Sequence, residues 1–191
     1  MGLALPPVRR DHGGMMKKLL SLGAAALAAL VGGCGDGPST VPGGYRNAAT
    51  WSTFFAATSS GPLLIEVHGN PFGDPAAELR ARLAKAMSAA IPARPFAMTA
   101  DAQAAPSPKV RVVVALGAPP SLDAAELCAG KVAVAAARAG GGRVELLAAF
   151  CDGGSLLSSV RGWVAKVDGS DDARFTRLLG QVMRELAGDP P

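Results

Sequence analysis

Alternating and β-branched apolar runs along the chain predict a sheet. Residues 63–68 alternate, so every second side chain would face a core, while Glu66 and His68 share the opposite face. Residues 110–116 contain successive valines and predict a central strand. Further strands are predicted at 94–100, 131–138, 143–150 and 156–167, the first of them at a sheet edge because it contains a proline. The glycines at 140–142 predict a hairpin between the second and third of these.

Two other segments repeat apolar residues at helical spacing. We expect Asp74 to cap the first of them, at residues 75–91. We expect Ser170 to cap the second, which carries an unbroken apolar stripe over 175–186. Together the elements predict a single α+β domain at 61–188. It would be a two-layer sandwich, a mostly antiparallel sheet with two helices packed on one face.

A different pattern precedes this domain. Two lysines lead into an uncharged apolar run at 19–31, which is too short to span a membrane and has the length of a signal-peptide core. Small residues then lead into Gly33 and Cys34. This order predicts that residues 15–33 are a leader, and that residues 1–14, which precede a second methionine, are a non-native upstream extension. A buried N-terminal helix is the alternative, and the glycines after the apolar run disfavour it.

Residues 31–34, VGGC, resemble the lipobox of bacterial lipoproteins. The resemblance implies that signal peptidase II cuts between Gly33 and Cys34 and that the Cys34 thiol carries a diacylglycerol. The first expected partner of the chain is therefore a lipid bilayer, through acylated Cys34. Gly35 stands where an aspartate would resemble an inner-membrane retention signal. This favours the inner leaflet of the outer membrane, with the domain facing the periplasm.

Cleavage at this point would change the charge balance. Removing 33 residues from 191 leaves 158, which is enough for one domain with a single core. The removed segment holds four of the 19 Lys and Arg residues and one of the 15 Asp and Glu residues, which leaves 15 against 14 and a net charge of +1. A nearly neutral surface has no long-range field for nucleic acid, so we expect no nucleic-acid partner.

Residues 34–60 join the leader to the predicted domain. The stretch GDGPSTVPGG at 35–44 is rich in Gly, Pro and Ser and predicts a flexible tether. Four aromatic residues follow closely: Tyr45, Trp51, Phe54 and Phe55. They favour an arm or edge strand that packs on the domain, and a free partner-binding motif is the alternative.

The cysteines agree with an oxidising compartment. With Cys34 acylated, Cys128 and Cys151 remain as an even pair, which predicts a disulfide. Two buried free thiols are the alternative. A single helical turn at 122–127 would place Cys128. No CxxC spacing is present and the cleaved chain holds one histidine, so we expect no metal ion, and no motif indicates a cofactor.

That histidine is His68, so any mechanism that needs a histidine must use it. The interpretations are a structural role in the turn at 69–73, contact with a ligand, or acid–base catalysis with Glu66 on the same strand face. No GxSxG or HExxH motif accompanies it. The sequence therefore predicts no catalytic residue.

The polar residues of the predicted sheet would gather on its open face. Glu66, His68, Lys109, Arg111 and Glu145 are the candidates, although their register is not set by local sequence. The functional interpretation is a groove for a partner protein or an anionic lipid head group, with Lys109 and Arg111 as phosphate contacts. A solvated face is the alternative.

Three stretches of the chain, VHGNPFG at 67–73, LCAG at 127–130 and RFTRLLGQVM at 174–183, resemble uncharacterised proteobacterial lipoproteins. The element order is similar to that of the lipopolysaccharide-assembly lipoprotein of Gram-negative outer membranes. Neither resemblance implies an activity. The sequence thus predicts a lipid-anchored periplasmic protein that acts by binding, as an accessory or envelope-assembly factor with an envelope protein partner. An envelope hydrolase using His68 and a purely structural lipoprotein are the alternatives.

Overall fold

The computed structural model describes residues 1–2, 36–132, 134 and 142–188. The chain divides into two compact units, Met1–Gly35 and Asp36–Pro191, and the helices and strands described belong to the second. Apart from residues 1–2, the predicted extension at 1–14 lies outside the described residues, as do the leader at 15–33 and Cys34. Within the described ranges, no helix is long and apolar enough to cross a membrane.

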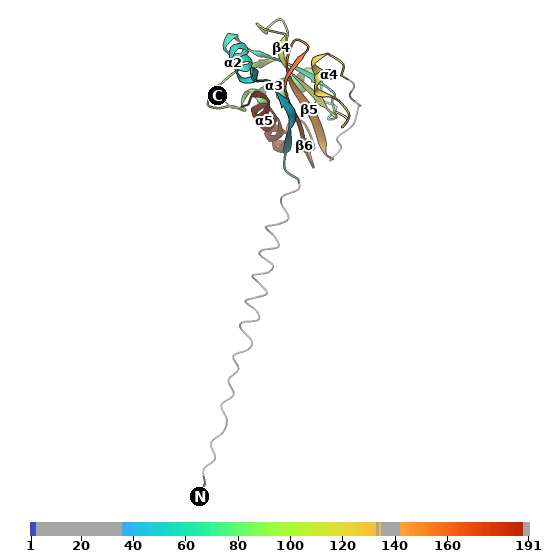
Figure 1. The fold of residues 1–191 in the computed structure, drawn as a ribbon. Helices are drawn as coiled ribbons and strands as arrows, with labels where there is room; N and C mark the ends of the chain where they lie inside the picture. The colour runs from blue at the N-terminus through green and yellow to red at the C-terminus, as the bar shows by residue number, and fades with distance from the viewer. Residues whose placement is uncertain (3–35, 133, 135–141, 189–191) are drawn as a thin grey trace. The chain divides into compact units, whose positions relative to one another are not determined.

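Six strands form one mixed sheet (Figure 1). They are β1 (Ser39–Arg46), β2 (Leu63–His68), β3 (Met98–Thr99), β4 (Val110–Leu116), β5 (Val144–Asp152) and β6 (Ser155–Val164). Their order in the sheet is β1-β6-β5-β4-β2-β3. The β1–β6, β6–β5 and β5–β4 pairs are antiparallel, whereas β2 runs parallel to both β4 and β3. The sheet is therefore mostly antiparallel, with its parallel part at the β3 edge.

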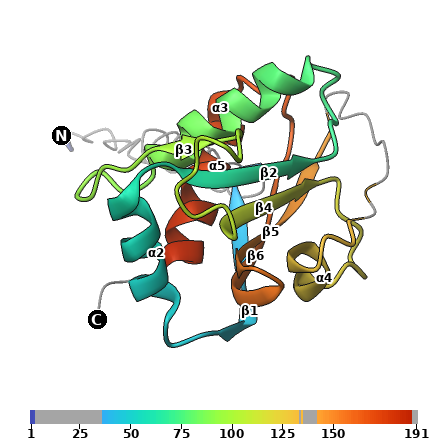
Figure 2. The ribbon, with the colours of Figure 1, turned by 90° about the horizontal axis from the view of Figure 1, so that it is seen from above.

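Four helices among the described residues pack against this sheet. They are α2 (Thr50–Ser60), α3 (Ala76–Ser88), α4 (Ala124–Cys128) and α5 (Ala173–Ala187). Helices α2, α3 and α5 cover one face, here called the inner face, and α4 packs on the opposite, outer face (Figure 2). The predicted α+β fold is confirmed. Helices α3 and α5 are the two that the apolar spacing predicts, and α2 and α4 join them.

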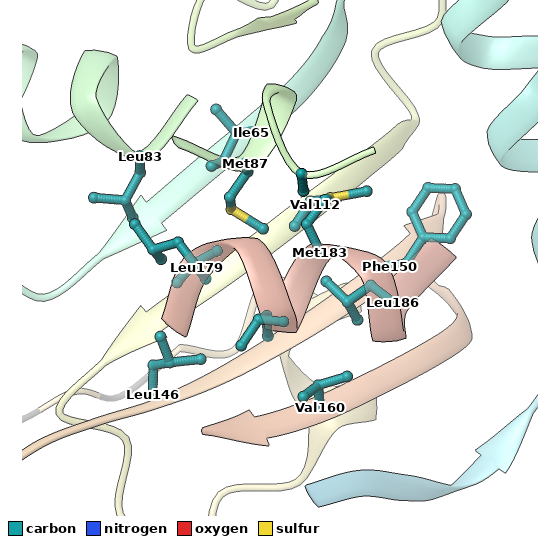
Figure 3. Packing of buried hydrophobic residues seen from close by; sticks show 14 of the residues in the cluster. Ile65, Leu83, Met87, Val112, Leu146, Phe150, Val160, Leu179, Met183 and Leu186 are labelled. Atoms are coloured by element: carbon teal, nitrogen blue, oxygen red, sulfur yellow. The ribbon is translucent and has the colours of Figure 1, made fainter. Parts of the chain in front are cut away.

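The main hydrophobic core lies between the inner face and its helices, and Figure 3 shows side chains of the two layers pointing toward one another. The sheet contributes Ile65, Val112, Leu146, Phe150 and Val160, and the helices contribute Leu83, Met87, Leu179, Met183 and Leu186. Helix α5 approaches β6 so closely that a Cβ at Gly162 would lie 3.0 Å from Cδ1 of Leu178. Glycine at this position therefore allows helix and sheet to pack tightly.

A second, smaller core lies on the outer face beneath α4. Its buried members are Val113, Ala115, Ala118, Leu122, Leu127, Cys128, Leu147, Ala149 and Cys151. A disulfide joins Cys128 at the end of α4 to Cys151 in β5, with Cα atoms 5.5 Å apart. The bond fastens the short helix to the sheet, which is important because five residues form too short a helix to be stable alone.

The local strand patterns identify some strands and misplace others. The strands predicted at 63–68 and 110–116 are confirmed, with the same bounds, as β2 and β4. The predicted hairpin between 131–138 and 143–150 is wrong, because β5 is paired on one side with β4 and on the other with β6. Residues 131, 132 and 134 form no strand, and the rest of 131–138 lies outside the described residues.

The stretch predicted as a flexible tether is partly a strand. Residues 39–44 belong to β1, which pairs with β6 from Ser39 opposite Trp163 onward. The pairing is interrupted between Pro42 and Arg46. Proline has no N–H to donate, and an edge strand tolerates this because one side of the strand needs no partner. The predicted flexible tether is therefore wrong for residues 39–44, because composition carries no information about the long-range pairing with β6.

The aromatic segment packs on the domain, but as helix α2 and not as an arm or strand. The Phe54 ring is fully buried and contacts the rings of Trp51, Phe96 and Phe150 at centroid distances of 5.7, 5.2 and 6.4 Å. Arg94 holds the helix from outside, donating to the Phe55 carbonyl at 3.0 Å. Tertiary contacts therefore stabilise a helix whose sequence has little helical propensity.

The two predicted caps do not cap their helices. Pro75 occupies the N-cap position of α3, and Asp172 that of α5. Instead, the buried Ser170 hydroxyl donates to the Asp74 carboxylate and accepts from Nη1 of Arg82 at 2.8 Å. The hydrogen bond between Ser170 and Asp74 thus joins the loop that leads into α5 to the loop that leads into α3.

The true cap of α5 gives a test by pH. Asp172 accepts from the guanidinium of Arg174 at 2.8 Å and from its backbone N–H at 2.7 Å, and these bonds lower the pKa of the carboxyl from 3.8 to about 2. Because the folded-state pKa is the lower one, the stabilisation is fully present above about pH 5 and is lost as the pH falls toward about pH 2. Asp172→Asn keeps a capping side chain but cannot titrate. Urea unfolding should show that the stability difference between the native chain and this variant is constant at neutral pH and shrinks in that acid range. A difference that does not change with pH would contradict the assignment.

Candidate functional site

The outer face of the sheet carries the polar residues that the sequence singles out. Among the described residues, helix α4 covers the part of this face over β5, β6 and β4, and does not cover the part over β2. On β2, Glu66 lies beside Val113 of β4, and His68 lies beside Ala115. The side chains of Glu66 and His68 are 38% and 37% exposed. Parallel pairing of β2 with β4 therefore places Glu66 and His68 near Arg111, the second residue of β4.

Arg111 of β4 closes one end of this row. Its Nε lies 2.9 Å from Oε1 of Glu66, as an ion pair without the alignment of a hydrogen bond. Its other nitrogens donate to the carbonyls of Gly153 at 2.9 Å, Cys128 at 3.0 Å and Lys109 at 3.3 Å. The guanidinium is directed at four protein oxygens, so little of it remains for a phosphate. Its position joins the disulfide-bonded end of α4 to β4 and β2.

His68 is held differently. Its Nε2 is 4.0 Å from Oε2 of Glu66 and is buried without a hydrogen-bond partner among the described residues. The turn that follows is held instead by Asn70, which accepts from the Gly73 N–H at 3.0 Å and donates to the Asp74 carbonyl at 2.6 Å. A partly exposed ring with an unsatisfied nitrogen can accept or donate one further hydrogen bond.

The remaining two candidates lie farther out. Lys109 is exposed just before β4 and makes no ion pair with another described residue. Glu145 pairs with Arg143 at 2.9 Å near the start of β5, while Arg111 lies opposite Cys151 at the other end of that strand. Six residues of strand separate the two positions by roughly 20 Å. The structure thus groups Glu66, His68 and Arg111, and leaves Glu145 apart.

Two hollows along the edge of β2 adjoin this group. One, of about 240 Å³, is lined by Ile65, Glu66, Val67, His68, Arg80 and Ala100. The other, of about 270 Å³, is lined by Val67, Gly69, Asn70, Ala76, Leu79 and Arg80. Both include Val67 and Arg80, so they form one groove between the strand edge and α3. The sequence pattern does not single out Arg80, because a polar residue on an amphipathic helix is indistinguishable from the rest of a solvated face.

Arg111 and Lys109 make a matched pair of tests. Arg111→Gln should lower the free energy of unfolding by about 2 kcal/mol, because the carbonyls of Gly153 and Cys128 lose a charged donor. Lys109→Gln, at an exposed side chain, should change it by less than about 0.5 kcal/mol. Urea unfolding measures both. Equal effects would mean that Arg111 does not hold this part of the fold together.

Fold and site define a disulfide-bonded α+β domain with an open strand edge and a partly exposed acid–histidine pair. In the part of the chain that the structure describes, no group of three or more His, Cys, Asp or Glu side chains could hold a metal ion. No protein-family model matches the chain, and no curated protein matches it.

Among solved structures, a variant of PelC from Paraburkholderia phytofirmans, described as a dodecamer, is similar to this chain. The TM-score is 0.41 and the identity 14%, over 80% of this chain and 99% of that one. The similarity is distant, and it is too weak to transfer the assembly or the role of that protein to this chain.

Proposed function

We propose that this protein is a lipid-anchored lipoprotein that faces the periplasm and works by binding, as an accessory or envelope-assembly protein. The observation that carries the proposal is the order of residues 17–34: two lysines, an apolar run, small residues and Cys34. Acylation of Cys34, with cleavage before it, would place the domain in the cell envelope, with the outer membrane favoured by Gly35.

The second unit supports this placement. The disulfide between Cys128 and Cys151 is of the kind that persists in an oxidising compartment and is rare in the cytosol. It pairs the two cysteines that would remain after Cys34 is acylated. All three cysteines then have a chemical role that fits a protein exported across the inner membrane.

Binding is favoured by the open part of the sheet. Glu66 and His68 are partly exposed next to a groove, and the buried Nε2 of His68 has no hydrogen-bond partner among the described residues. The exposed part of the imidazole ring beside this groove is a position where a bound molecule could make contact. The proposed binding face therefore consists of Glu66, His68 and Lys109, with Arg111 holding Glu66 in place.

One observation favours a second candidate, an envelope hydrolase. Glu66 and His68 lie 4.0 Å apart, so a small adjustment would bring them into the hydrogen bond of an acid–base pair. His68→Gln would abolish such an activity and leave the size of the chain and its membrane attachment unchanged. An ester-cleavage assay that gives the same rate with and without the substitution excludes this candidate.

The proposal is tested at Cys34. In cells that express the full chain, Cys34→Ser is expected to abolish metabolic palmitate labelling, to leave the leader attached, and to move the protein out of the lipid-linked membrane fraction. Gly37→Ser is the matched control, because a side chain there meets no atom within 4 Å. If Cys34→Ser leaves labelling, size and fractionation unchanged, the protein is not a lipoprotein.

A further inference from the structure

We propose that the free edge of β2 binds an extended peptide segment as an added strand, and that an acidic side chain of this peptide pairs with Arg80. The proposal deepens the binding role given above and rests on it. It assigns the partner a chemical class: a chain segment in extended conformation with an acidic side chain on the side that faces α3.

The edge exists because β3 is short. Strand β3 pairs only with Leu63 and Leu64 of β2, through Met98 and Thr99. The chain then turns away, since the Thr99 hydroxyl accepts from the backbone N–H of Asp101 at 3.1 Å. From Ile65 to His68, β2 therefore pairs on this side with no strand that the structure describes, and a peptide of four or five residues, about 13–17 Å long, would fit beside it.

The main-chain N–H and C=O groups of alternate β2 residues point toward the side where a strand could be added. The N–H of Leu63 donates to the Ala97 carbonyl at 2.9 Å, on the β3 side of the strand. In a strand the main-chain groups of alternate residues point to the same side, so those of Val67 also face this side, beyond the end of β3. Such unpaired groups at a sheet edge are the template for strand addition.

The groove next to this edge has room for a strand and its side chains. The two hollows, of about 240 and 270 Å³, lie one after the other along β2. Ala100 lines the first and Asn70 the second, and Val67 and Arg80 line both. Leu79 supplies an apolar wall from α3. The edge is thus lined on one side by a helix, and this helix would contact every second side chain of an added strand.

The positive charge of Arg80 favours a peptide with an acidic side chain. Arg80 is exposed and makes no ion pair or hydrogen bond with another described residue, whereas the next arginine of α3, Arg82, pairs with Glu78 and Asp74. An acidic side chain on the α3 side of an added strand would satisfy Arg80. Side chains on the other side would meet His68, whose Nε2 has no partner among the described residues.

The opposite edge of the sheet is a poorer site. Strand β1 pairs irregularly with β6, with a break between Pro42 and Arg46. Pro42 has no N–H, so a strand added to this edge would lose regular hydrogen bonding there. The edge of β2 contains no proline and belongs to a strand with regular pairing to β4.

The experiment uses the full chain purified in detergent and three fluorescent seven-residue peptides with blocked ends. The first peptide alternates valine and aspartate. The second has the same sequence with N-methyl groups on its valines, and the third has the same sequence with N-methyl groups on its aspartates. In an added strand, one set of N–H groups faces β2 and the other faces solvent. We therefore expect the unmethylated peptide to bind with a Kd below about 1 mM, one methylated peptide to bind similarly, and the other to lose binding.

Two variants locate the site. Arg80→Glu is expected to weaken binding of the aspartate peptide about tenfold or more, and a peptide with lysine in place of aspartate should then bind the variant better than the native chain. Arg177→Glu, at an exposed arginine of α5 without an ion pair among the described residues, should leave binding unchanged. In hydrogen exchange, the amide of Val67 should become protected when the peptide is bound.

Three results would overturn the proposal: no binding of the aspartate peptide below about 1 mM, equal binding of the two methylated peptides, or equal weakening by Arg80→Glu and Arg177→Glu. The Cys34→Ser experiment has a separate readout in lipid labelling. A chain that is labelled but does not bind the peptide remains a lipoprotein without this site. A chain that binds the peptide but is not labelled keeps the site and loses the proposed anchor.

Discussion

Phe54→Ala is expected to lower the free energy of unfolding by about 3–5 kcal/mol. The ring is fully buried, and its neighbours Trp51, Phe96 and Phe150 come from α2, from the segment before β3 and from β5. They cannot all move inward to fill the space, so a cavity remains in addition to the lost transfer free energy. Urea unfolding followed by tryptophan fluorescence would measure the loss, because Trp51 adjoins the cavity.

Phe55→Ala is the control on the same helix. Its ring is 51% exposed and stacks with Arg94, whose guanidinium carbon is 4.3 Å from the ring centroid. Loss of this exposed contact should cost only about 0.5–1 kcal/mol. If the two substitutions have equal effects, α2 does not pack through Phe54.

Removal of the disulfide has the second largest expected effect. The double variant Cys128→Ala, Cys151→Ala should be less stable by about 3 kcal/mol, because the bond closes a loop with a sequence separation of 23 and restricts the unfolded chain. Both cysteines lie in the small core under α4, so its packing should weaken first. The measurement is the free energy of unfolding in urea.

A reducing agent provides the control for this variant. It should lower the melting temperature of the native chain toward that of the double variant and leave the melting temperature of the variant unchanged. Thiol titration of the denatured, unreduced chain should find neither Cys128 nor Cys151 reactive. Two reactive thiols there would favour the alternative of buried free cysteines.

The elements that could be predicted from the sequence are those with a local cause. Strands β2 and β4 follow from alternation and from successive valines; β4 lies in the interior of the sheet, and β2 lies between β4 and the two-residue β3. Helix α5 follows from its apolar stripe, each member of which is at most 1% exposed. In these segments the side-chain pattern and the burial agree, because each packs through one regular face.

The elements that could not be predicted have a distant cause. Strand β1 forms because β6 offers it an edge more than a hundred residues away in the chain. Helix α2 is rich in Thr, Ser and aromatic residues, which disfavour helices, and it forms because Phe54 enters the core. The hairpin error has the same origin, since glycines mark a turn but do not specify which strands it joins.

The candidate site shows the same division. Alternation along β2 correctly places Glu66 and His68 on one face. That Arg111 lies against Glu66 depends on the parallel register of β2 and β4, in which Leu64 is opposite Arg111. That its guanidinium is taken up by carbonyls depends on the disulfide-bonded end of α4. Arg80 lies beside an unpaired part of β2 only because β3 ends after two residues, and the local sequence does not show this.

The early start of β1 limits how far the domain could stand from a membrane. Five residue-to-residue steps lead from Cys34 to Ser39, where the first strand begins, and five extended residues reach at most about 18 Å. A lipid on Cys34 would keep the start of β1, and with it the near side of the domain, close to the head groups. Molecules embedded in the same leaflet, or long enough to come down to its surface, could meet it, and those that stay near the opposite membrane could not.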